Sequence, residues 1–373
     1  MMDVPELTVA YANISQRVAL SYLRSLADLT LVAPEGLAEE QQAELLAAER
    51  ELHAFFRAFY EALYANPGGF GLPVQADTAI PEDHRIDQRV RQEINQKFKR
   101  IRAAINLALD VLMEFGRNGR LAGPALILPQ GADEPLAKPL KTLKKFLAGL
   151  EQVGVQVERV SDGLALSSTA YPAMAPALQA LARAAAQMED AHLGRFCFAR
   201  CDFQALRAGY APEPLTLYRT FNAADYARVV ELHRFYTGLG YKALPEIRDV
   251  ATWLVNYQGN RKIKATPLLQ VFFQDHWRQQ MMVAIKPASA NRIAPIMAHQ
   301  PESLQRDFFA RANRCNAPQC QWCKTRKGLG PSQLEYQGQQ KTICWYVNPD
   351  VRELDDEMVA VIKAYALMHE ELK

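Results

Sequence analysis

The sequence contains no run of 18 apolar residues and almost no excess of charge. The first absence excludes the usual signal of a membrane-spanning helix. The formal net charge of +2 favours neither an acidic nor a basic partner. The chain also begins without a basic stretch that leads into an apolar one, so it does not resemble a secretory signal. We therefore expect a cytoplasmic protein with no membrane partner.

Complete catalytic motifs are missing as well. No G-x-S-x-G, G-x-G-x-x-G or P-loop pattern occurs, and the seven histidines show no H-x3-H spacing. Asp275 and His276 are adjacent in an expected turn, where a solvated hairpin tip is the simpler role. The sequence therefore favours a binding or regulatory protein over an enzyme, and it indicates no substrate.

Helical periodicity dominates the first 120 residues. Helices are expected over about 5–30, 34–64 and 84–117. The third has apolar residues every three or four positions, which approximates a heptad seam that packs against another helix. The seam residues are Ile86, Val90, Ile94, Phe98, Ile101, Ile105, Leu109 and Leu112. We expect an all-helical domain over residues 1–120, with the seam available for self-association or a protein partner.

The pattern changes to a mixture of helices and short strands over residues 121–373. Val155–Val160 and Leu164–Leu166 flank Asp162-Gly163, a pair of turn residues typical of a β-hairpin. Other strands are expected over 125–128, 195–203, 253–257, 268–273 and 281–285, and another hairpin is expected from 334–336 and 342–347. Other helices are expected over 134–153, 172–189, 222–236, 301–313 and 352–371. This part is predicted to be an α+β domain with antiparallel hairpins, so the fold class is α+β.

Four of the six cysteines fall within thirty residues. Cys315, Cys320, Cys323 and Cys344 have the spacing C-x4-C-x2-C-x20-C. Zn²⁺ accepts four thiolates in a tetrahedron, and a C-x2-C pair suits a loop that directs both sulfurs at one ion. Four sulfur ligands leave no open coordination position, so the predicted zinc site over residues 315–344 is structural.

The charge around these cysteines agrees with a zinc site. Between Arg311 and Cys344 there are six basic residues and one acidic residue, Glu335. The basic residues are Arg311, Arg314, Lys324, Arg326, Lys327 and Lys341. Positive charge lowers the pKa of thiols and offsets the negative charge of a zinc–thiolate centre.

Two other interpretations of the cysteines stay open. The order C-x4-C-x2-C followed by a distant cysteine is also that of plant-type iron–sulfur ferredoxins. The loop here contains Pro318, Gln319, Gln321 and Trp322 where such a cluster needs small residues, and the last gap is short. Without any metal, Cys344 would be a buried strand residue. Cys197 and Cys201 are separate and are expected to be buried thiols on a strand.

Nucleic-acid binding is a further alternative. Basic residues gather in the third helix, in the turn over 258–264 and in the cysteine loop, and together they would form a phosphate-contacting face. Those of the helix are Arg85, Arg89, Arg91, Lys97, Lys99, Arg100 and Arg102, against Asp87 and Glu93. Solvated helix faces of a nearly neutral protein are the simpler interpretation.

Several short pieces between Leu164 and Tyr346 carry a resemblance. They are Ala170-Tyr-Pro172, Arg200-Cys-Asp-Phe203, Gly240-Tyr-Lys242, Asn313-Arg-Cys315, Cys320-Gln-Trp-Cys323 and Ile343-Cys-Trp-Tyr346. On these the chain resembles a group of uncharacterised bacterial proteins with a C-terminal C-x4-C-x2-C…C-W-Y motif. The group has no assigned activity, so the resemblance implies no function.

Overall fold

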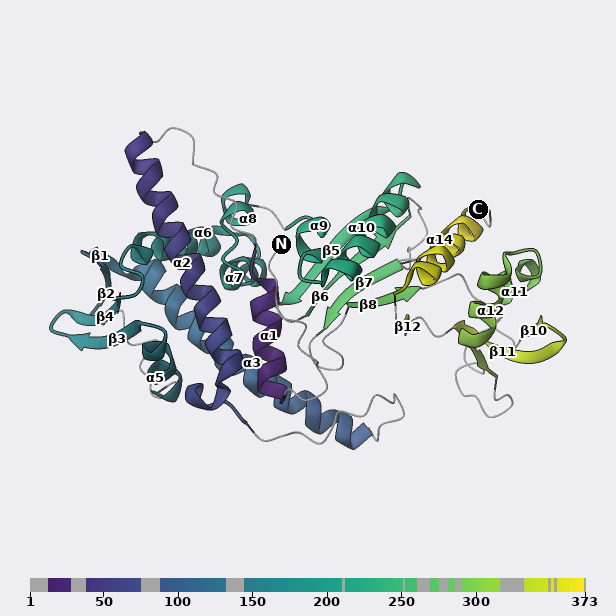
Figure 1. Cartoon of the computed structure of the whole chain (residues 1–373), viewed down its shortest axis with the longest axis horizontal. Helices are drawn as coiled ribbons and strands as arrows, with labels where there is room; N and C mark the ends of the chain where they lie inside the picture. Colours follow the sequence, from purple (N-terminus) through teal and green to yellow (C-terminus); the bar gives the residue numbers. More distant parts are fainter. Residues whose placement is uncertain are drawn as a thin grey trace. The chain divides into compact units, whose positions relative to one another are not determined.

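The computed structural model describes residues 13–27, 38–74, 88–131, 144–209, 212–250, 252–259, 269–274, 281–285, 290–315, 332–347, 350–351 and 354–371. Helices and strands both occur along these residues (Figure 1). Every strand pair whose register is described is antiparallel. The α+β class expected from the sequence is confirmed as a mixture of helices and antiparallel sheet.

The chain divides into two compact units. The first comprises Met1–Thr220, Ile247–Trp253 and Gln274–Gln280, and the second comprises Phe221–Glu246, Leu254–Phe273 and Met281–Lys373. The first unit extends past residue 120 because α6 (Met174–Gln187) packs on both α2 (Glu39–Ala65) and α3 (Gln88–Asn118). The domain boundary expected at residue 120 stays a prediction.

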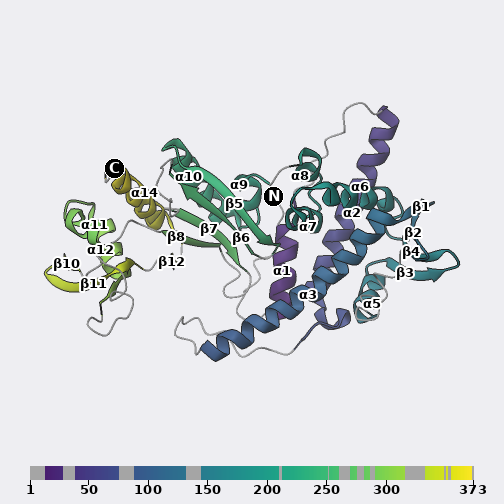
Figure 2. The ribbon, with the colours of Figure 1, turned by 180° about the vertical axis from the view of Figure 1, so that it is seen from behind.

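In the first unit, α1 (Ile14–Ser25) also contacts both α2 and α3, and Figures 1 and 2 show this helical group from opposite sides. A capping box begins α1. The Asn13 side chain accepts from the Gln16 N–H, and the Gln16 side chain accepts from the Asn13 N–H. The apolar seam of α3 is buried from Phe98 to Leu112. This part of the seam therefore packs within the chain.

Aromatic rings from α2 form the centre of this unit. Phe55, Phe56, Phe59 and Tyr60 are each 0% exposed. The Phe59 ring centroid lies 5.9 Å from that of Phe70 in η2 (Pro67–Phe70) and 5.7 Å from that of Phe146 in α5 (Lys144–Gln152). A Cβ on Gly149 of α5 would lie 2.4 Å from the Phe70 ring, so only glycine permits this approach.

A four-stranded sheet lies at one end of the same unit, in the order β1-β2-β4-β3. Its strands are β1 (Arg120–Ala122), β2 (Ala125–Pro129), β3 (Val155–Val160) and β4 (Gly163–Ser168). Val160 pairs with Gly163, which confirms the hairpin expected at Asp162-Gly163. Leu126, Leu128 and Leu166 are fully buried in this sheet, and β2 packs on α3.

The strand expected over Arg195–Phe203 is wrong. Two helices lie here, α7 (Ala191–Ala199) and α8 (Phe203–Ala208), and α9 (Pro214–Tyr218) follows them. Asp190 caps α7, because its side chain accepts from the His192 N–H at 2.8 Å. Since α7 is buried from Phe196 to Ala199, its apolar residues follow one another without the helical period that marks a half-exposed helix.

A five-stranded sheet in the order β12-β8-β7-β6-β5 lies mainly in the second unit. The strands are β5 (Lys242–Asp249), β6 (Thr252–Gln258), β7 (Leu269–Gln274), β8 (Met281–Ile285) and β12 (Asp350–Val351). β6 is buried from Thr252 to Tyr257, so both of its faces are covered. Helices α10 (Ala223–Gly238) and α14 (Asp356–Glu371) contact each other.

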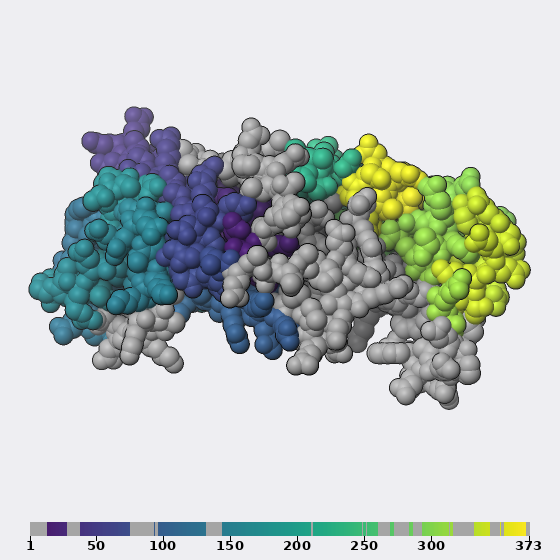
Figure 3. Space-filling model, turned by 60° about the horizontal axis from the view of Figure 1, so that its bottom comes forward, coloured from purple at the N-terminus to yellow at the C-terminus, as the bar shows by residue number. Residues whose placement is uncertain are grey.

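A smaller three-stranded sheet, β10-β11-β9, also belongs to the second unit. Its strands are β9 (Ala312–Arg314), β10 (Ser332–Tyr336) and β11 (Gln339–Val347), and α11 (Ala290–Met297) and α12 (Glu302–Arg311) contact them. In Figure 3 the yellow-green atoms of β10 and β11 lie against the green atoms of these helices. Gln337 and Gly338 join β10 to β11 with φ of 48° and 73°, as a tight hairpin turn requires.

Among the described residues, no helix combines the length and the apolar character needed to cross a membrane.

Candidate functional site

Of the four predicted zinc ligands, Cys315 and the backbone of Cys344 lie in the described part of the structure, at the three-stranded sheet. Cys320 and Cys323 are outside the described residues, and so is the side chain of Cys344, whose backbone belongs to β11. Cys315 directly follows β9, and its N–H donates to the carbonyl oxygen of Thr342 on β11 at 2.9 Å. The backbone therefore brings Cys315 to a position two residues along β11 from Cys344.

The surroundings of Cys315 are positively charged. Its thiol is free and partly exposed, and the neighbouring Arg314 is exposed. On β11, Lys341 Nζ donates to the carbonyl oxygen of Phe309 on α12 at 2.8 Å. Burial and, second, the charge of Arg314 lower the pKa of Lys341. The basic character predicted around the cysteines is thus present at Cys315.

No cluster of three or more His, Cys, Asp or Glu side chains within the described residues has the geometry to hold a metal ion. Three of the four predicted ligands have side chains outside that part of the chain. The zinc site and the iron–sulfur alternative therefore stay predictions. Asp275 and His276, weighed as an acid–base pair, also lie outside the described residues.

Cys197 and Cys201 are buried thiols, as expected, although they lie on a helix and its end. Burial, with the charge of Asp202 second, raises the pKa of Cys197 to about 12. Burial and then the charges of Glu49 and Asp202 raise the pKa of Cys201 well above its ordinary value. Because a thiolate is the reactive form, neither thiol suits nucleophilic chemistry at neutral pH.

The end of α7 has a partner for each of its last carbonyl groups. Cys197 and Phe198 accept from the N–H groups of Asp202 and Cys201, both at 2.9 Å. Ala199 accepts from the Tyr60 hydroxyl at 2.7 Å, and Arg200 accepts from the Ala27 N–H at 2.8 Å. A buried helix end needs such partners, since these carbonyls have none inside the helix.

Charged side chains that were not predicted from the sequence gather around this helix end. Glu49 is 0% exposed and pairs with Arg207, while Asp202 lies 3.8 Å from Arg200 Nε. Burial raises the pKa of Glu49, and the nearby Arg207 charge opposes that rise. His53 Nε2 lies 2.8 Å from the carbonyl oxygen of Ala27, so this nitrogen carries the proton and donates.

A signal for the buried charges did exist in the sequence. Glu49 and His53 are four residues apart and fall between the apolar residues Leu45, Leu52 and Phe56, whose helical spacing puts them on one face of α2. Their spacing therefore placed them on the buried side. The partners on α8 and before it are about 150 residues away in sequence, so no local pattern points to them.

A row of polar side chains crosses the five-stranded sheet. Gln270 Nε2 on β7 donates to Asn256 Oδ1 on β6 at 2.5 Å, and Asn256 Nδ2 lies 3.5 Å from Glu246 Oε2 on β5. Asn256 and Gln270 are each 8% exposed. Gln270 Oε1 is buried and accepts no hydrogen bond from the described residues. Burying two amides is costly unless they are paired, so this row requires its internal hydrogen bonds.

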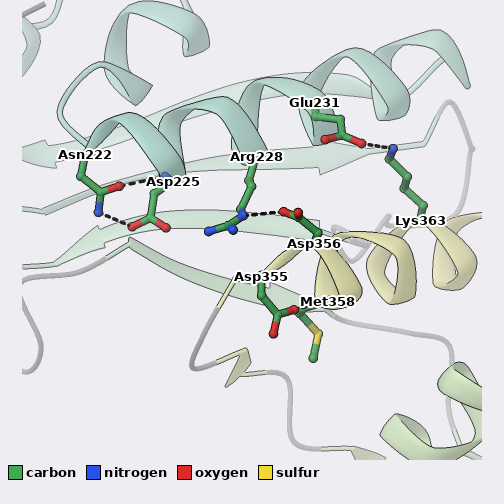
Figure 4. Close-up of polar contacts among 8 residues, drawn as sticks. All are labelled: Asn222, Asp225, Arg228, Glu231, Asp355, Asp356, Met358 and Lys363. Carbon is green, nitrogen blue, oxygen red and sulfur yellow. Dashed lines mark hydrogen bonds and ion pairs between the residues drawn. The ribbon is translucent and has the colours of Figure 1, made fainter.

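Helices α10 and α14 are joined by polar contacts on the surface of the second unit (Figure 4). Arg228 Nε lies 3.0 Å from Asp356 Oδ1, and Lys363 pairs with Glu231. The Asp356 side chain is 91% exposed, so these pairs contribute little to stability. These ion pairs link the surfaces of α10 and α14.

The basic residues of α3 are only partly available. Lys97, Lys99 and Arg100 are exposed. Arg102 instead donates to Asp249 Oδ2 at 2.9 Å and to Thr252 Oγ1 at 3.1 Å, within the first unit. Arg85 lies outside the described residues, and nothing is described of the side chains of Arg89 and Arg91.

Known proteins provide no further guide to these sites. Comparisons with protein-family models, with curated proteins and with solved structures found no match to this chain. The resemblance to bacterial proteins with the same cysteine pattern stays a prediction. Among the described residues, the Cys315 end of the β9–β11 pairing contains a predicted metal ligand.

Proposed function

We propose that the chain is a zinc-stabilised binding protein in which Cys315, Cys320, Cys323 and Cys344 hold one structural zinc ion. The observation that supports it is the hydrogen bond from the Cys315 N–H to Thr342. Two of the proposed ligands are far apart in sequence, and the β9–β11 pairing brings their backbones together. A shared ion needs this arrangement.

The spacing of β-strands is compatible with such a site. Neighbouring strands lie about 4.8 Å apart. Zinc–sulfur bonds of about 2.3 Å place two sulfurs on one ion about 3.8 Å apart. The positive charges of Arg314 and Lys341 would offset the negative charge of four thiolates. With four sulfur ligands the ion has no position for substrate, so its role is to stabilise.

Elemental analysis of untagged protein tests the zinc site. We expect about one zinc per chain, and loss of zinc in Cys315→Ser, Cys320→Ser and Cys323→Ser. Cys197→Ala is the matched control, because this cysteine is buried in the other compact unit and should leave zinc unchanged. Protein with neither zinc nor iron would defeat the proposal, and brown protein that contains iron would favour the iron–sulfur redox alternative.

The partner of the binding protein is proposed to be another protein or a second copy of the chain. The seam of α3 is occupied by the chain's own helices from Phe98 onward. We assign self-association to the earlier residues of the predicted seam, Ile86, Val90 and Ile94, whose side chains lie outside the described part of the structure. Light scattering coupled to size exclusion should show an oligomer that becomes a monomer in Val90→Glu. An unchanged mass in that variant, or a monomeric wild type, would remove this surface from consideration.

Nucleic-acid binding is the second candidate, because Lys97, Lys99 and Arg100 are exposed on one segment of α3. Each phosphate contact contributes about −0.9 to the slope of log affinity against log salt. Fluorescence anisotropy with single- and double-stranded DNA should then show weaker binding at higher salt and a shallower slope in Lys99→Ala/Arg100→Ala. Lys144→Ala, an exposed lysine on α5, is the control. Absence of binding at 50 mM salt would end this candidate.

A further inference from the structure

Cys315 is connected to α12 without an intervening loop. Helix α12 ends at Arg311, and β9 begins at Ala312 and ends at Arg314. Ala312 is the C-cap of the helix, and its N–H still donates to the Phe308 carbonyl. A strand that continues directly from a helix end transmits its position to that helix. Whatever fixes Cys315 against β11 therefore also fixes the C-terminal end of α12.

One side of α12 is held by the same small sheet. Lys341 Nζ on β11 donates to the Phe309 carbonyl at 2.8 Å and lies 5.2 Å from the centre of the Phe309 ring. The Phe309 ring in turn lies 5.7 Å from that of Tyr336 on β10. These contacts join α12 to β10 and β11, while β9 joins the end of the helix to β11 through the backbone.

The other side of α12 faces α14. Arg311 Nε donates to both carboxylate oxygens of Asp307, at 2.8 and 2.7 Å, and the Tyr365 hydroxyl donates to Asp307 Oδ2 at 3.0 Å. Asp307 and Arg311 are 11% and 12% exposed, so water screens these contacts little. Arg311 Nη2 also reaches the sulfur of Met358 at 3.5 Å. Helix α12 thus links the cysteine end of the sheet to α14.

The pairing of β9 is weak when considered alone. This strand has three residues, lies at the edge of its sheet, and has a register irregularity opposite Ile343–Val347. Few ladder hydrogen bonds hold such a strand, and short edge strands open readily. An ion bound by both Cys315 and a cysteine of β11 would hold β9 to β11 more firmly.

We propose that the metal state of the cysteine region determines how firmly α14 is held, and that α12 transmits the effect through Asp307 and Tyr365. The inference rests on the proposed zinc site. With zinc bound, β9 is fixed to β11 and α12 keeps the orientation that its buried contacts with α14 require. Without zinc, α12 loses the attachment that Cys315 provides through the ion, so its end moves more freely and α14 is held less firmly. The coupling runs through a contiguous series of contacts.

Hydrogen–deuterium exchange of the full chain, zinc-loaded and after chelation, tests this coupling. We expect chelation to speed exchange about tenfold in peptides of α12 and of α14 up to Ala366, since loss of one buried charged contact has this size of effect. Peptides of α2 and α6 should not change. In Tyr365→Phe, zinc content should be unchanged, α14 should exchange faster while zinc is bound, and chelation should add less. Arg228→Met, which removes an α10–α14 pair, should leave the response to chelation intact.

The outcomes separate this inference from the proposed function. Protein that carries no zinc as purified defeats the zinc site itself. Loss of zinc with unchanged exchange in α14 overturns the coupling and leaves the zinc site standing. Equal acceleration in α2 and α14 also overturns the coupling, because it would show a general loss of stability.

Discussion

The N–H of Asp202 donates to the carbonyl oxygen of Cys197 at 2.9 Å. Together with the bond from the Cys201 N–H to Phe198, it forms the pair of contacts that defines a Schellman helix end. In this motif the residue that follows the C-cap is usually glycine, because its backbone takes a left-handed conformation. Here it is Cys201, with φ of 52°. Cys197 therefore has a helical backbone and Cys201 a left-handed one, so the two positions favour different residues.

The first prediction compares glycine and alanine at these two positions. Cys201→Gly should be more stable than Cys201→Ala by about 1 kcal/mol, because alanine pays for the left-handed conformation and glycine does not. At Cys197, inside α7, the order should reverse by about 1 kcal/mol. Urea unfolding of the four variants measures both differences. The same order at both positions would contradict the left-handed assignment of Cys201.

The second prediction concerns the Tyr60 hydroxyl. Tyr60→Phe should lower the free energy of unfolding by about 1–2 kcal/mol, because the Ala199 carbonyl would remain buried without its donor. Tyr226→Phe, at a half-buried position on α10, should change stability by less than about 0.5 kcal/mol. Thermal and urea unfolding compare the two variants. Equal losses of unfolding free energy in the two variants would show that the hydrogen bond from Tyr60 to Ala199 does not stabilise the fold.

The third prediction is a pH dependence from Glu49. Its pKa is raised in the folded state, so folding favours the protonated carboxyl. The stability that it contributes is complete below its unfolded pKa of about 4.3 and is lost as pH rises through the raised folded pKa. Wild type should therefore lose stability relative to Glu49→Gln as the pH rises above about 4, measured by urea unfolding. Glu44→Gln, an exposed site on the same helix, should show no such trend.

Sequence patterns predicted the elements that have one buried face. The spacing of Phe98, Ile101 and Ile105 marked α3, and Asp162-Gly163 marked the β3–β4 hairpin. The same reasoning failed for α7, because a helix buried on nearly all sides shows no period of its own. It also missed β5, where Pro245 argues against a strand. The structure places β5 at the edge of its sheet, where a proline costs no ladder bond.

The candidate sites were predictable to different degrees. The cysteine spacing selected residues 315–344 as a predicted metal site, because metal ligands often cluster locally in sequence. The pairing of Cys315 with Thr342 could not be read from it, since β9 is too short to give a pattern. The charges around Glu49 and Arg207 depend on contacts between distant segments. Only the three-dimensional packing shows them.

The last prediction concerns the amide pair in the five-stranded sheet. Asn256→Leu and Gln270→Leu should each cost about 1–3 kcal/mol, because each change leaves one amide atom of the other residue buried without its partner. Leucine at both positions removes the unpaired group along with its partner. The double variant should therefore cost less than the sum of the single changes, by about 1 kcal/mol or more.

A second double-mutant cycle, at an exposed pair of polar side chains, is the control for this test. Gln333 Nε2 donates to Thr342 Oγ1 at 3.1 Å across β10 and β11, but both side chains are exposed. Alanine changes at these two positions should be additive within about 0.5 kcal/mol, because water replaces the lost partner. Urea unfolding of all six variants yields both coupling energies. Additive losses at Asn256 and Gln270 would mean that water reaches the sheet face that carries them, and that their burial does not enforce the pairing.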